Sequence, residues 1–422
     1  MNDDALQGRL DEMTAELLDR YEELTLLYDL GASFAEVLDV DRVCEIAIEK
    51  AGSTIGATKA IVALAADDGL YAAALRGTDR LSAGGITEHV ATTGRELLLH
   101  GGEPPPTGVS RDDTEDGPVL SVPLLPPGDD PPLGALTLAG KPGGVPFTAG
   151  DAKLAGAVAA QLAAAVYRSR LVDSLRSAEA VRHEVEIAAG IQRTLLPARP
   201  PDVPGVALAA LCVPAANVGG DYYDFVVDGE GRLSLVIADV AGHSIGSALM
   251  MAMARSILRR ELAEGKSPAA VLTATNGALF DDLVRSQLFL TVFCARFDPR
   301  SGLLEYANGG HNPPMLRRAA GGIDELDADG AAIGILRDIE FEPGSVGLSA
   351  GDALLLYTDG VTEAAAPSRE QFGEERLREV FDGSTPSELV DAIYSAARAH
   401  AGIGSSQSDD ITLVALRAEE VD

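Results

Sequence analysis

The spacing of apolar residues divides the first 170 residues into helices and short strands. Apolar steps of three and four residues predict a helix over residues 6–30 and another over residues 40–56. Short apolar runs predict strands at residues 60–65, 70–75, 119–125 and 133–139. The Ala-rich segment 149–170 predicts a closing helix, with Thr148 as its N-cap. This segment therefore reads as an α+β domain.

A charged helix is predicted next, over residues 171–196. Its apolar positions are Leu171, Leu175, Ala178, Val181, Val185, Ala188, Ile191 and Leu195. Their mean step is about 3.5 residues, which is the spacing of a coiled-coil seam. Pro197 and the prolines that follow it end the helix. The pattern fits two interpretations, a helix packed on its own C-terminal domain or a parallel homodimer helix that relays a signal.

Strands and Gly turns dominate the rest of the chain, and they enclose paired helices. Strands are predicted at residues 206–213, 224–227, 233–239, 288–298, 303–308, 315–318, 353–358 and 411–416. Helices are predicted at residues 247–264, 268–285, 374–382 and 386–399. Runs of strands with paired helices favour an α+β sandwich over a parallel α/β fold.

Charge and cysteine content narrow the function classes. The formal net charge of −32 argues against a nucleic-acid binder or a binder of anionic membranes, because both need a basic surface. Cys44, Cys212 and Cys294 are too scattered for a zinc signature or a disulfide framework. The acidic N-terminus does not read as a signal peptide, and no apolar stretch is long enough to span a membrane. These features predict a cytoplasmic protein.

Candidate chemistry lies in four aspartate-bearing turns at the ends of predicted strands. They are VGGDYYD with Asp221, IADVAGHS with Asp239, LYTDGVTEA with Asp359, and SQSDDITLVAL with Asp409 and Asp410. Carboxylates at strand ends are unfavourable to bury unless cations or hydrogen bonds compensate. Several of them at one sheet edge suit Mg²⁺ or Mn²⁺. One such turn is usually only a turn, but four in one domain predict a metal site.

These turns, in this order, resemble the metal-binding motifs of PPM (type 2C) serine/threonine phosphatases of the bacterial sporulation protein E branch. The stretch YANGGHNPPMLRR is also typical of that branch. The resemblance implies a sandwich of two antiparallel sheets flanked by helices, with two or three Mn²⁺ or Mg²⁺ ions. It implies Asp221 and Asp239 as ligands, Asp239 bridging two ions, and the Val240 carbonyl as a further ligand. It also implies Asp359 and Asp409 as ligands at the second metal position. Asp410 is implied either as a ligand at a third metal position or as a residue that supports the ligands without binding a metal.

The segments ahead of this domain carry resemblances of their own. The stretches VLSVPLLPPGDDPPLGALTLAG and FTAGDAKLAGAVAAQLAAAV resemble a GAF domain, which implies an unknown small molecule or partner as its signal. EIAAGIQRTLLP resembles the linker before bacterial PPM phosphatases of the sporulation and stress-response type. The predicted organisation is a GAF-like sensor over residues 1–170, a coiled-coil linker over 171–196 and a phosphatase domain over 197–422.

The resemblance implies a phosphoserine or phosphothreonine protein as substrate, with a STAS-domain anti-sigma-factor antagonist as the expected one. The alternative is a catalytically silent regulator that only binds a partner. Ser244 is the one feature that favours the alternative, since the family has Gly there, and Ser is strained if its φ is positive. His243 fits a structural or an acid role, and Glu363 either supports Asp359 or begins a helix. His311 is expected to order a hairpin turn.

Overall fold

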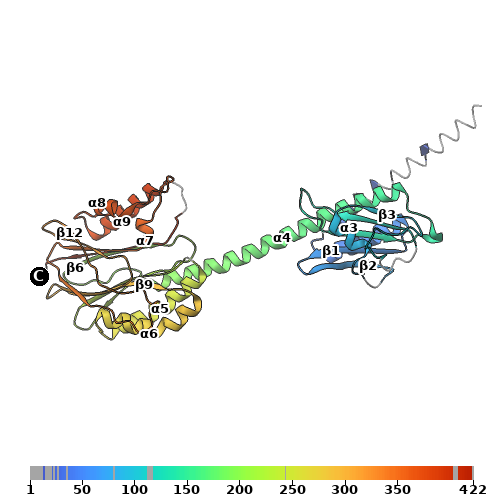
Figure 1. Ribbon diagram of the computed structural model, residues 1–422. Helices are drawn as coiled ribbons and strands as arrows, with labels where there is room; N and C mark the ends of the chain where they lie inside the picture. Colours follow the sequence, from blue (N-terminus) through green and yellow to red (C-terminus); the bar gives the residue numbers. More distant parts are fainter. Residues whose placement is uncertain are drawn as a thin grey trace, which may run out of the picture. The chain divides into compact units, whose positions relative to one another are not determined.

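The computed structural model describes residues 13–14, 21, 24–25, 28–34, 37–78, 81–111, 117–242, 244–402 and 407–420 (Figure 1). Its contacts divide the chain into two compact units, Met1–Glu179 and Ala180–Asp422. Most of the helix predicted at residues 6–30 lies outside the described residues. Those of its residues that are described are helical.

The first unit is one antiparallel sheet with helices on both faces. Its elements are α2 Val40–Ile55, β1 Lys59–Ala66, β2 Gly69–Arg76, α3 Ile86–Thr93, β3 Leu97–Leu99, β4 Val119–Leu124, β5 Gly134–Ala139, the short 3₁₀ helix η2 Pro142–Gly144 and, as far as Glu179, the first part of α4 Ala149–Leu195. The strand order is β2-β1-β5-β4-β3. Alternate strand residues such as Val62, Val122 and Leu136 pack against α2 and the first half of α4. Residues of opposite parity, such as Val119 and Ala135, pack against α3.

Helix α4 is one continuous helix of 47 residues, although the sequence predicted two consecutive segments. Thr148 caps it as predicted, because its Oγ1 accepts a hydrogen bond from the Asp151 backbone N–H at 3.2 Å. Asp151 returns the contact by accepting from the Thr148 N–H at 2.6 Å. Lys141 pairs with the same carboxylate at 2.8 Å. The start of the helix is therefore fixed by a closed set of hydrogen bonds.

The second unit contains two five-stranded antiparallel sheets. After α4, its elements are β6 Val206–Val213, β7 Asp221–Val227, β8 Leu233–Val240, α5 Ile245–Ala263, α6 Pro268–Ser286, β9 Leu290–Asp298, β10 Leu303–Gly309, β11 Met315–Arg317, β12 Ile323–Glu325, β13 Gly344–Gly347, β14 Ala353–Tyr357, α7 Asp359–Thr362, α8 Gly373–Val380, α9 Pro386–Ala401 and β15 Ile411–Ala418. One sheet has the order β13-β10-β9-β8-β7, and the other has the order β12-β11-β14-β15-β6. The mixed α+β class predicted from the sequence is confirmed.

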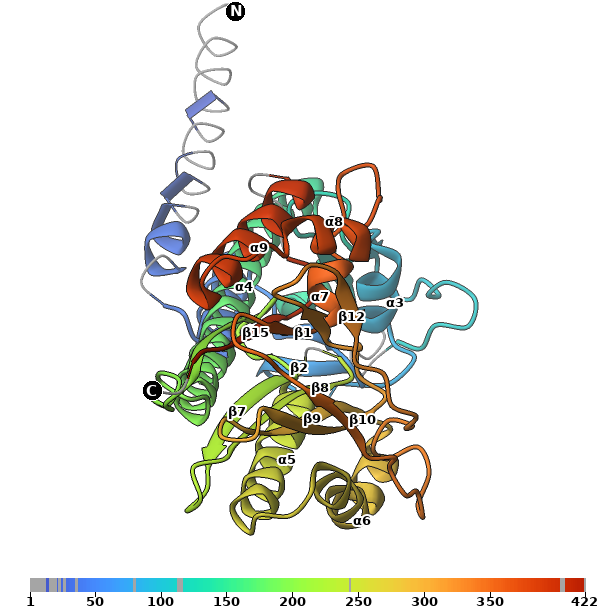
Figure 2. The same ribbon diagram turned by 90° about the vertical axis from the view of Figure 1, so that its left-hand side faces the viewer.

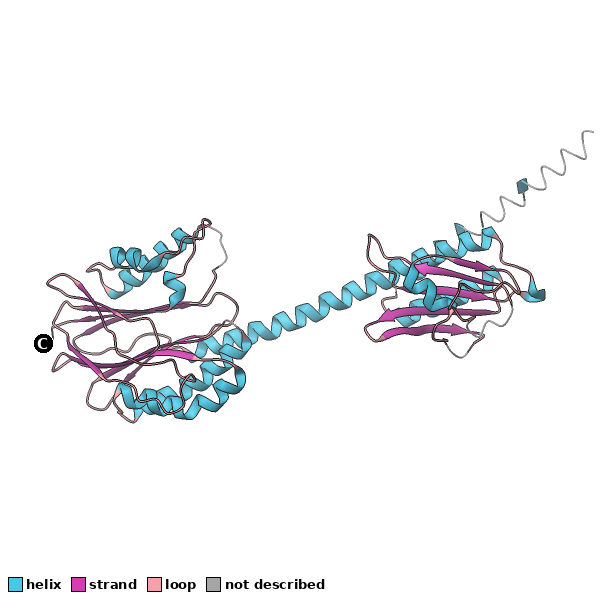
Figure 3. Ribbon diagram, in the orientation of Figure 1, coloured by secondary structure: helices cyan, strands magenta, loops and turns pink. Residues whose placement is uncertain are grey.

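Three apolar layers hold these sheets and helices together. The two sheets pack face to face through residues such as Phe225, Ile237, Leu356 and Val414. The outer face of the first sheet is covered by α5 and α6, and that of the second by α7, α8 and α9 (Figures 2 and 3). The result is a helix–sheet–sheet–helix sandwich, and one edge of the space between its sheets holds the candidate site.

Among the helices of the described segments, none combines the length and the apolar character that crossing a membrane requires.

Cys44 and Cys294 are buried, and Cys212 is half-buried. Burial raises the pKa of each of these thiols to about 12, so all three stay protonated near neutral pH.

Candidate active site

Strand alternation sends two of the predicted aspartates into the space between the sheets. Along β8, Leu233, Leu235 and Ile237 belong to the core between the sheets, and Asp239 continues the same parity. Along β7, Tyr223 and Phe225 do so, and Asp221 has their parity. Asp221 and Asp239 are direct partners across the ladder. Both carboxylates therefore point inward at the end of the first sheet.

The second sheet brings its own polar groups to the same edge. Thr358 directly follows β14, and its Oγ1 donates a 2.9 Å hydrogen bond to Asp221 Oδ2. The same oxygen accepts the Thr412 N–H of β15 at 2.9 Å. Thr358 is completely buried. This hydroxyl joins the two sheets at the candidate site and orients one oxygen of Asp221.

Asp410 holds the loop that leads into β7. Its Oδ1 accepts the Ala215 N–H and its Oδ2 accepts the Gly220 N–H, both at 2.7 Å. A Cβ atom at Gly219 would lie 2.2 Å from Asp410 Oδ2, and one at Gly220 would lie 2.3 Å from the Val240 carbonyl oxygen. Both positions need glycine because the backbone passes so close to its neighbours.

The aspartates raise one another's pKa values. Burial raises the pKa of Asp221 well above its usual range, and the neighbouring charge of Asp239 adds to this. The pKa of Asp239 rises to about 7, first through burial and then through the charges of Asp359, Asp409 and Asp410. The pKa of Asp359 is raised by burial and then by Asp409, and that of Asp410 is raised chiefly by burial. All five predicted carboxylates thus form one electrostatic cluster.

The donor set fits a hard divalent cation. Oxygen is the only donor atom it offers, and none of the ion pairs found in the described parts of the chain involves any of the five aspartates. Clustered carboxylates without a cationic partner are unfavourable, which a bound cation would relieve. Within the described ranges, however, no three His, Cys, Asp or Glu side chains are gathered closely enough to hold a metal ion as they stand. The aspartates are neighbours at one edge rather than a closed cage.

Ser244 is unstrained in the structure. Its φ is −96°, and it is the N-cap of α5, where its Oγ accepts the Ser247 N–H at 3.2 Å. The preceding turn already has glycine at Gly242, whose φ is 87°. The serine therefore replaces the family's glycine without cost and caps the helix that follows the Asp239 strand. His243 lies outside the described residues.

His311 lies in the turn that it was expected to order, but the Asn308 side chain orders that turn and the His311 ring binds elsewhere. Its backbone N–H donates to Asn308 Oδ1 at 2.8 Å, and Asn308 Nδ2 donates to the His311 carbonyl at 2.9 Å. Its Nδ1 lies 2.9 Å from Thr291 Oγ1. Burial lowers the pKa of His311 to about 4, so the ring is neutral near pH 7. Glu363 ends helix α7 rather than beginning a helix, because it is the C-cap and its backbone N–H donates to the Asp359 carbonyl at 2.7 Å. Its charge also raises the pKa of Asp359.

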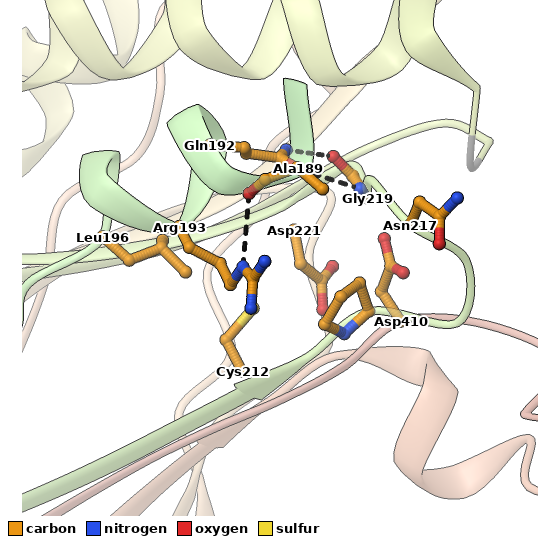
Figure 4. Close-up of a pocket in the computed structure, with 10 residues that line it drawn as sticks. Ala189, Gln192, Arg193, Leu196, Cys212, Asn217, Gly219, Asp221 and Asp410 are labelled. Carbon is orange, nitrogen blue, oxygen red and sulfur yellow. Dashed lines mark hydrogen bonds between the residues drawn. The ribbon is translucent and has the colours of Figure 1, made fainter. Parts of the chain in front are cut away.

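Two residues at this edge were not predicted from the sequence. Thr358 appeared only as the last residue of a strand, and Gln192 only as part of the linker motif. Gln192 makes two hydrogen bonds with the backbone of Gly219, two residues before Asp221 (Figure 4). The Thr358 contact is buried and those of Gln192 are half-buried, and no local sequence pattern marks the partners of either residue.

Two family models match the chain. The model described as Stage II sporulation protein E (SpoIIE) matches residues 229–419, and a GAF domain model matches residues 10–166. Protein IcfG of Synechocystis sp. is 32% identical over 263 residues, a match that covers 56% of this chain and 41% of IcfG. Phosphoserine phosphatase RsbU of Bacillus subtilis is 32% identical over 240 residues, which covers 56% of this chain and 70% of RsbU.

A solved structure supports the fold. The SiaA-PP2C domain of Pseudomonas aeruginosa matches with a TM-score of 0.50 at 24% identity, covering 58% of this chain and 99% of that domain. The sandwich and its two sheets are therefore those of a PP2C-type domain. Together with the RsbU match and the two family models, this establishes the identity of the family. The chain belongs to the SpoIIE-type PPM phosphatases, and a GAF domain precedes its phosphatase domain.

Proposed function

We propose that this protein is a metal-dependent serine/threonine protein phosphatase under the control of its GAF domain. The observation that carries the proposal is the meeting of five buried or half-buried aspartates from both sheets at one edge. A pure binding domain has no need to collect mutually repelling carboxylates there, which argues against the silent-regulator alternative. The unstrained Ser244 removes the one sequence feature that favoured that alternative.

Two or three Mn²⁺ or Mg²⁺ ions are the proposed cofactors. Asp221, Asp239, Asp359, Asp409 and the Val240 carbonyl would hold them. Asp410 engages both its oxygens with backbone N–H groups, which favours a role in fixing the Gly219–Gly220 loop over direct ligation. Bound cations supply water activation near neutral pH and neutralise charge on phosphoryl oxygens. Thr358 orients Asp221 for this task, and the Gly220 backbone lies against the Val240 carbonyl.

The proposed substrate is a serine- or threonine-phosphorylated protein, and a STAS-domain anti-sigma-factor antagonist is the specific candidate. The name of the relative RsbU, a phosphoserine phosphatase, supports the chemical class. A cytoplasmic location fits such a substrate. The test is phosphate release from a serine-phosphorylated STAS-domain protein by the full chain, in Mn²⁺ and in EDTA. Release in Mn²⁺ alone supports the proposal, whereas tight binding of the phosphoprotein without release supports the silent regulator.

We propose further that the sensor spans residues 1–170, the linker 171–196 and the phosphatase 197–422. We also propose that two copies of the protein form a homodimer by pairing their linker helices. Leu171, Leu175 and Val181 are 51%, 62% and 60% exposed on α4, as a seam awaiting a partner helix would be. Light scattering on the full chain tests this. Leu175→Glu should give a monomer, whereas Ala180→Glu, which adds the same charge at an exposed position on the other side of the helix, should leave the dimer intact.

A further inference from the structure

A polar residue stands beside Asp239 on the next strand of the first sheet. Thr291 on β9 is the direct cross-strand partner of Asp239, and Asp221 on β7 is the partner of Asp239 on its other side. Along β9, Phe293 and Phe297 belong to the core between the sheets, and Thr291 has their parity. The side chains of Asp221, Asp239 and Thr291 therefore form one inward-facing row across three neighbouring strands.

The Thr291 hydroxyl contacts the buried ring of His311. Thr291 Oγ1 lies 2.9 Å from His311 Nδ1. The backbone holds the ring there, because the His311 N–H and carbonyl both form hydrogen bonds with the Asn308 side chain. His311 is only 5% exposed, and its ring is neutral near pH 7 because burial lowers its pKa to about 4. One ring nitrogen thus carries a proton, and the other offers a lone pair.

The surroundings of the second ring nitrogen, Nε2, decide where that proton lies. Burial lowers the pKa of His311, whereas the backbone of Tyr357 at the end of β14 acts in the opposite direction. A backbone group raises the pKa of a histidine when its carbonyl attracts a ring N–H. Nδ1 faces Thr291, and Nε2 is buried without a closer hydrogen-bond partner among the described residues. The proton is therefore assigned to Nε2, on the side of the Tyr357 carbonyl.

This tautomer decides what the Thr291 hydroxyl can bind. With the ring proton on Nε2, Nδ1 accepts a hydrogen bond, and the Thr291 hydroxyl donates its only proton to it. The Thr291 oxygen then offers only lone pairs to the site. Carboxylates and phosphoryl oxygens are also acceptors, so none of them can form a hydrogen bond with it. Among the reactants of a hydrolysis, water is the one that brings a proton for this oxygen to accept.

We propose that Thr291 positions the water that attacks phosphorus, and that His311 keeps the Thr291 hydroxyl in its accepting state; this rests on the function proposed above. Thr291 accepts one hydrogen bond from the water and so turns a lone pair of the water toward the substrate. His311 is a positioning residue, because it acts only through Thr291. The pair should therefore set the rate of hydrolysis and leave the binding of cation and phosphate unchanged.

The test compares kcat for p-nitrophenyl phosphate hydrolysis at saturating Mn²⁺ in full-length variants. Thr291→Val keeps the shape of the side chain but loses its hydroxyl, and kcat should fall about tenfold. Thr291→Ser keeps the hydroxyl and should stay within about twofold of the wild type. His311→Leu leaves the backbone bonds to Asn308 in place and should lose as much kcat as Thr291→Val. The double variant should be no slower than either single variant, because the two residues act as one unit.

Three further measurements separate this role from damage to the site. The dissociation constant of Mn²⁺, from the electron paramagnetic resonance signal of the free ion, should change less than about twofold in Thr291→Val, as should the inhibition constant of inorganic phosphate. Nitrogen-15 NMR of the wild type should show the His311 proton on Nε2. His311 is recognised there as the ring that is still neutral at about pH 5. Thr273→Val is the matched control, because the exposed Thr273 hydroxyl bonds to the Ala269 carbonyl of its own helix, and kcat should not change.

A wild type without Mn²⁺-dependent hydrolysis would overturn the proposed function and this inference together. With an active wild type, an unchanged kcat in Thr291→Val would overturn the inference alone, as would independent, additive losses in the double variant. Weaker binding of Mn²⁺ or phosphate in step with the loss of kcat would also overturn it, because Thr291 would then belong to the binding site. A His311 proton on Nδ1 would contradict the accepting hydroxyl, and this measurement needs only the folded wild type, so it decides even if a variant fails to fold.

Discussion

Asp221 on β7 and Asp239 on β8 are direct partners across an antiparallel ladder, and both point into the space between the two sheets. Directly opposed like charges destabilise a strand pair. Here the charge of Asp239 adds to the burial that raises the pKa of Asp221, and burial together with the charges of Asp359, Asp409 and Asp410 raises the pKa of Asp239 to about 7. A cation at this edge would turn the repulsion into coordination. The pair therefore links the stability of the sandwich to cation binding.

Replacing Asp239 by Asn should abolish hydrolysis without harming the fold. We expect a loss of about a thousandfold in kcat/KM, since a lost cation site removes several kcal/mol of transition-state stabilisation. The melting temperature in EDTA near pH 8 should be equal to or above that of the wild type, because one of the clustered charges is removed.

Asp228→Asn is the control for this substitution. Asp228 lies in the turn at the other end of the same two strands, where it pairs with Arg232 at 2.7 Å. Its replacement should leave hydrolysis within about twofold, as is usual for surface positions away from the chemistry. Equal activity of Asp239→Asn and the wild type would remove Asp239 from the proposed metal ligands.

Cation affinity should depend on pH through Asp239. Its carboxyl is protonated below about pH 7 in the cation-free protein, and a cation must displace that proton. Mn²⁺ binding should therefore strengthen about tenfold between about pH 6 and pH 8 for one displaced proton. Titrations at the two pH values, followed by free Mn²⁺, measure this, and an affinity independent of pH would contradict the raised pKa.

The same pKa shift predicts how the cation-free fold responds to pH. Because the folded-state pKa of Asp239 lies above its ordinary value of 3.8, the unfolded chain binds fewer protons between these values. The contribution of Asp239 to the free energy of unfolding should thus fall as pH rises from about 4 to about 7 and level off above. Thermal melts in EDTA across this range check the sign, and Asp239→Asn should show a smaller fall.

Thr358 should matter for both stability and activity. Thr358→Val removes the donor to Asp221 and leaves the buried Thr412 N–H without its acceptor. The expected cost is about 1–3 kcal/mol in the free energy of unfolding, measured by urea titration. Hydrolysis should also fall, because Asp221 loses its orienting hydroxyl. Thr358→Ser keeps the hydroxyl and should restore both properties, and a fully active Val variant would contradict this role.

Ser244 should behave as a helix cap. Ser244→Ala should cost about 1 kcal/mol and Ser244→Gly only a few tenths, with hydrolysis retained in both. Ser267, the N-cap of α6, makes no side-chain capping bond, so Ser267→Ala should cost less than Ser244→Ala. An inactive Ser244→Ala with a normal melting temperature would instead mean that this hydroxyl takes part in the chemistry.

Long and strongly patterned elements were predictable from the sequence. Strand β6 and helices α6 and α9 lie where the apolar pattern predicted them, within two residues. The apolar pattern did not predict short elements, because too few residues contribute to it there. Helix α3 has eight residues, and β13 reads GSVG and exists because it pairs with β10. Strand β7 begins at Asp221 rather than Asp224, because two aspartates in the run obscured it.

The candidate site was predictable as a set of residue types but not as a geometry. Aspartates at strand ends mark the edge, since alternation and turns are local properties. The contacts of Thr358 and Gln192 arise only when distant segments pack together, with 137 residues separating Thr358 from Asp221. Such contacts leave no periodic signal in a single sequence. The continuity of α4 was hidden for a similar reason, because its apolar face changes from buried to exposed near Leu171.

The most direct test of the account is p-nitrophenyl phosphate hydrolysis by the full chain, with Mn²⁺ and with EDTA, beside Asp239→Asn. The account predicts turnover in Mn²⁺, none in EDTA and none in the variant under either condition. Turnover that persists in EDTA or in Asp239→Asn would contradict a cation site built on these aspartates. No turnover by the wild type in Mn²⁺, on this substrate and on a phosphorylated STAS-domain protein, would contradict the phosphatase itself.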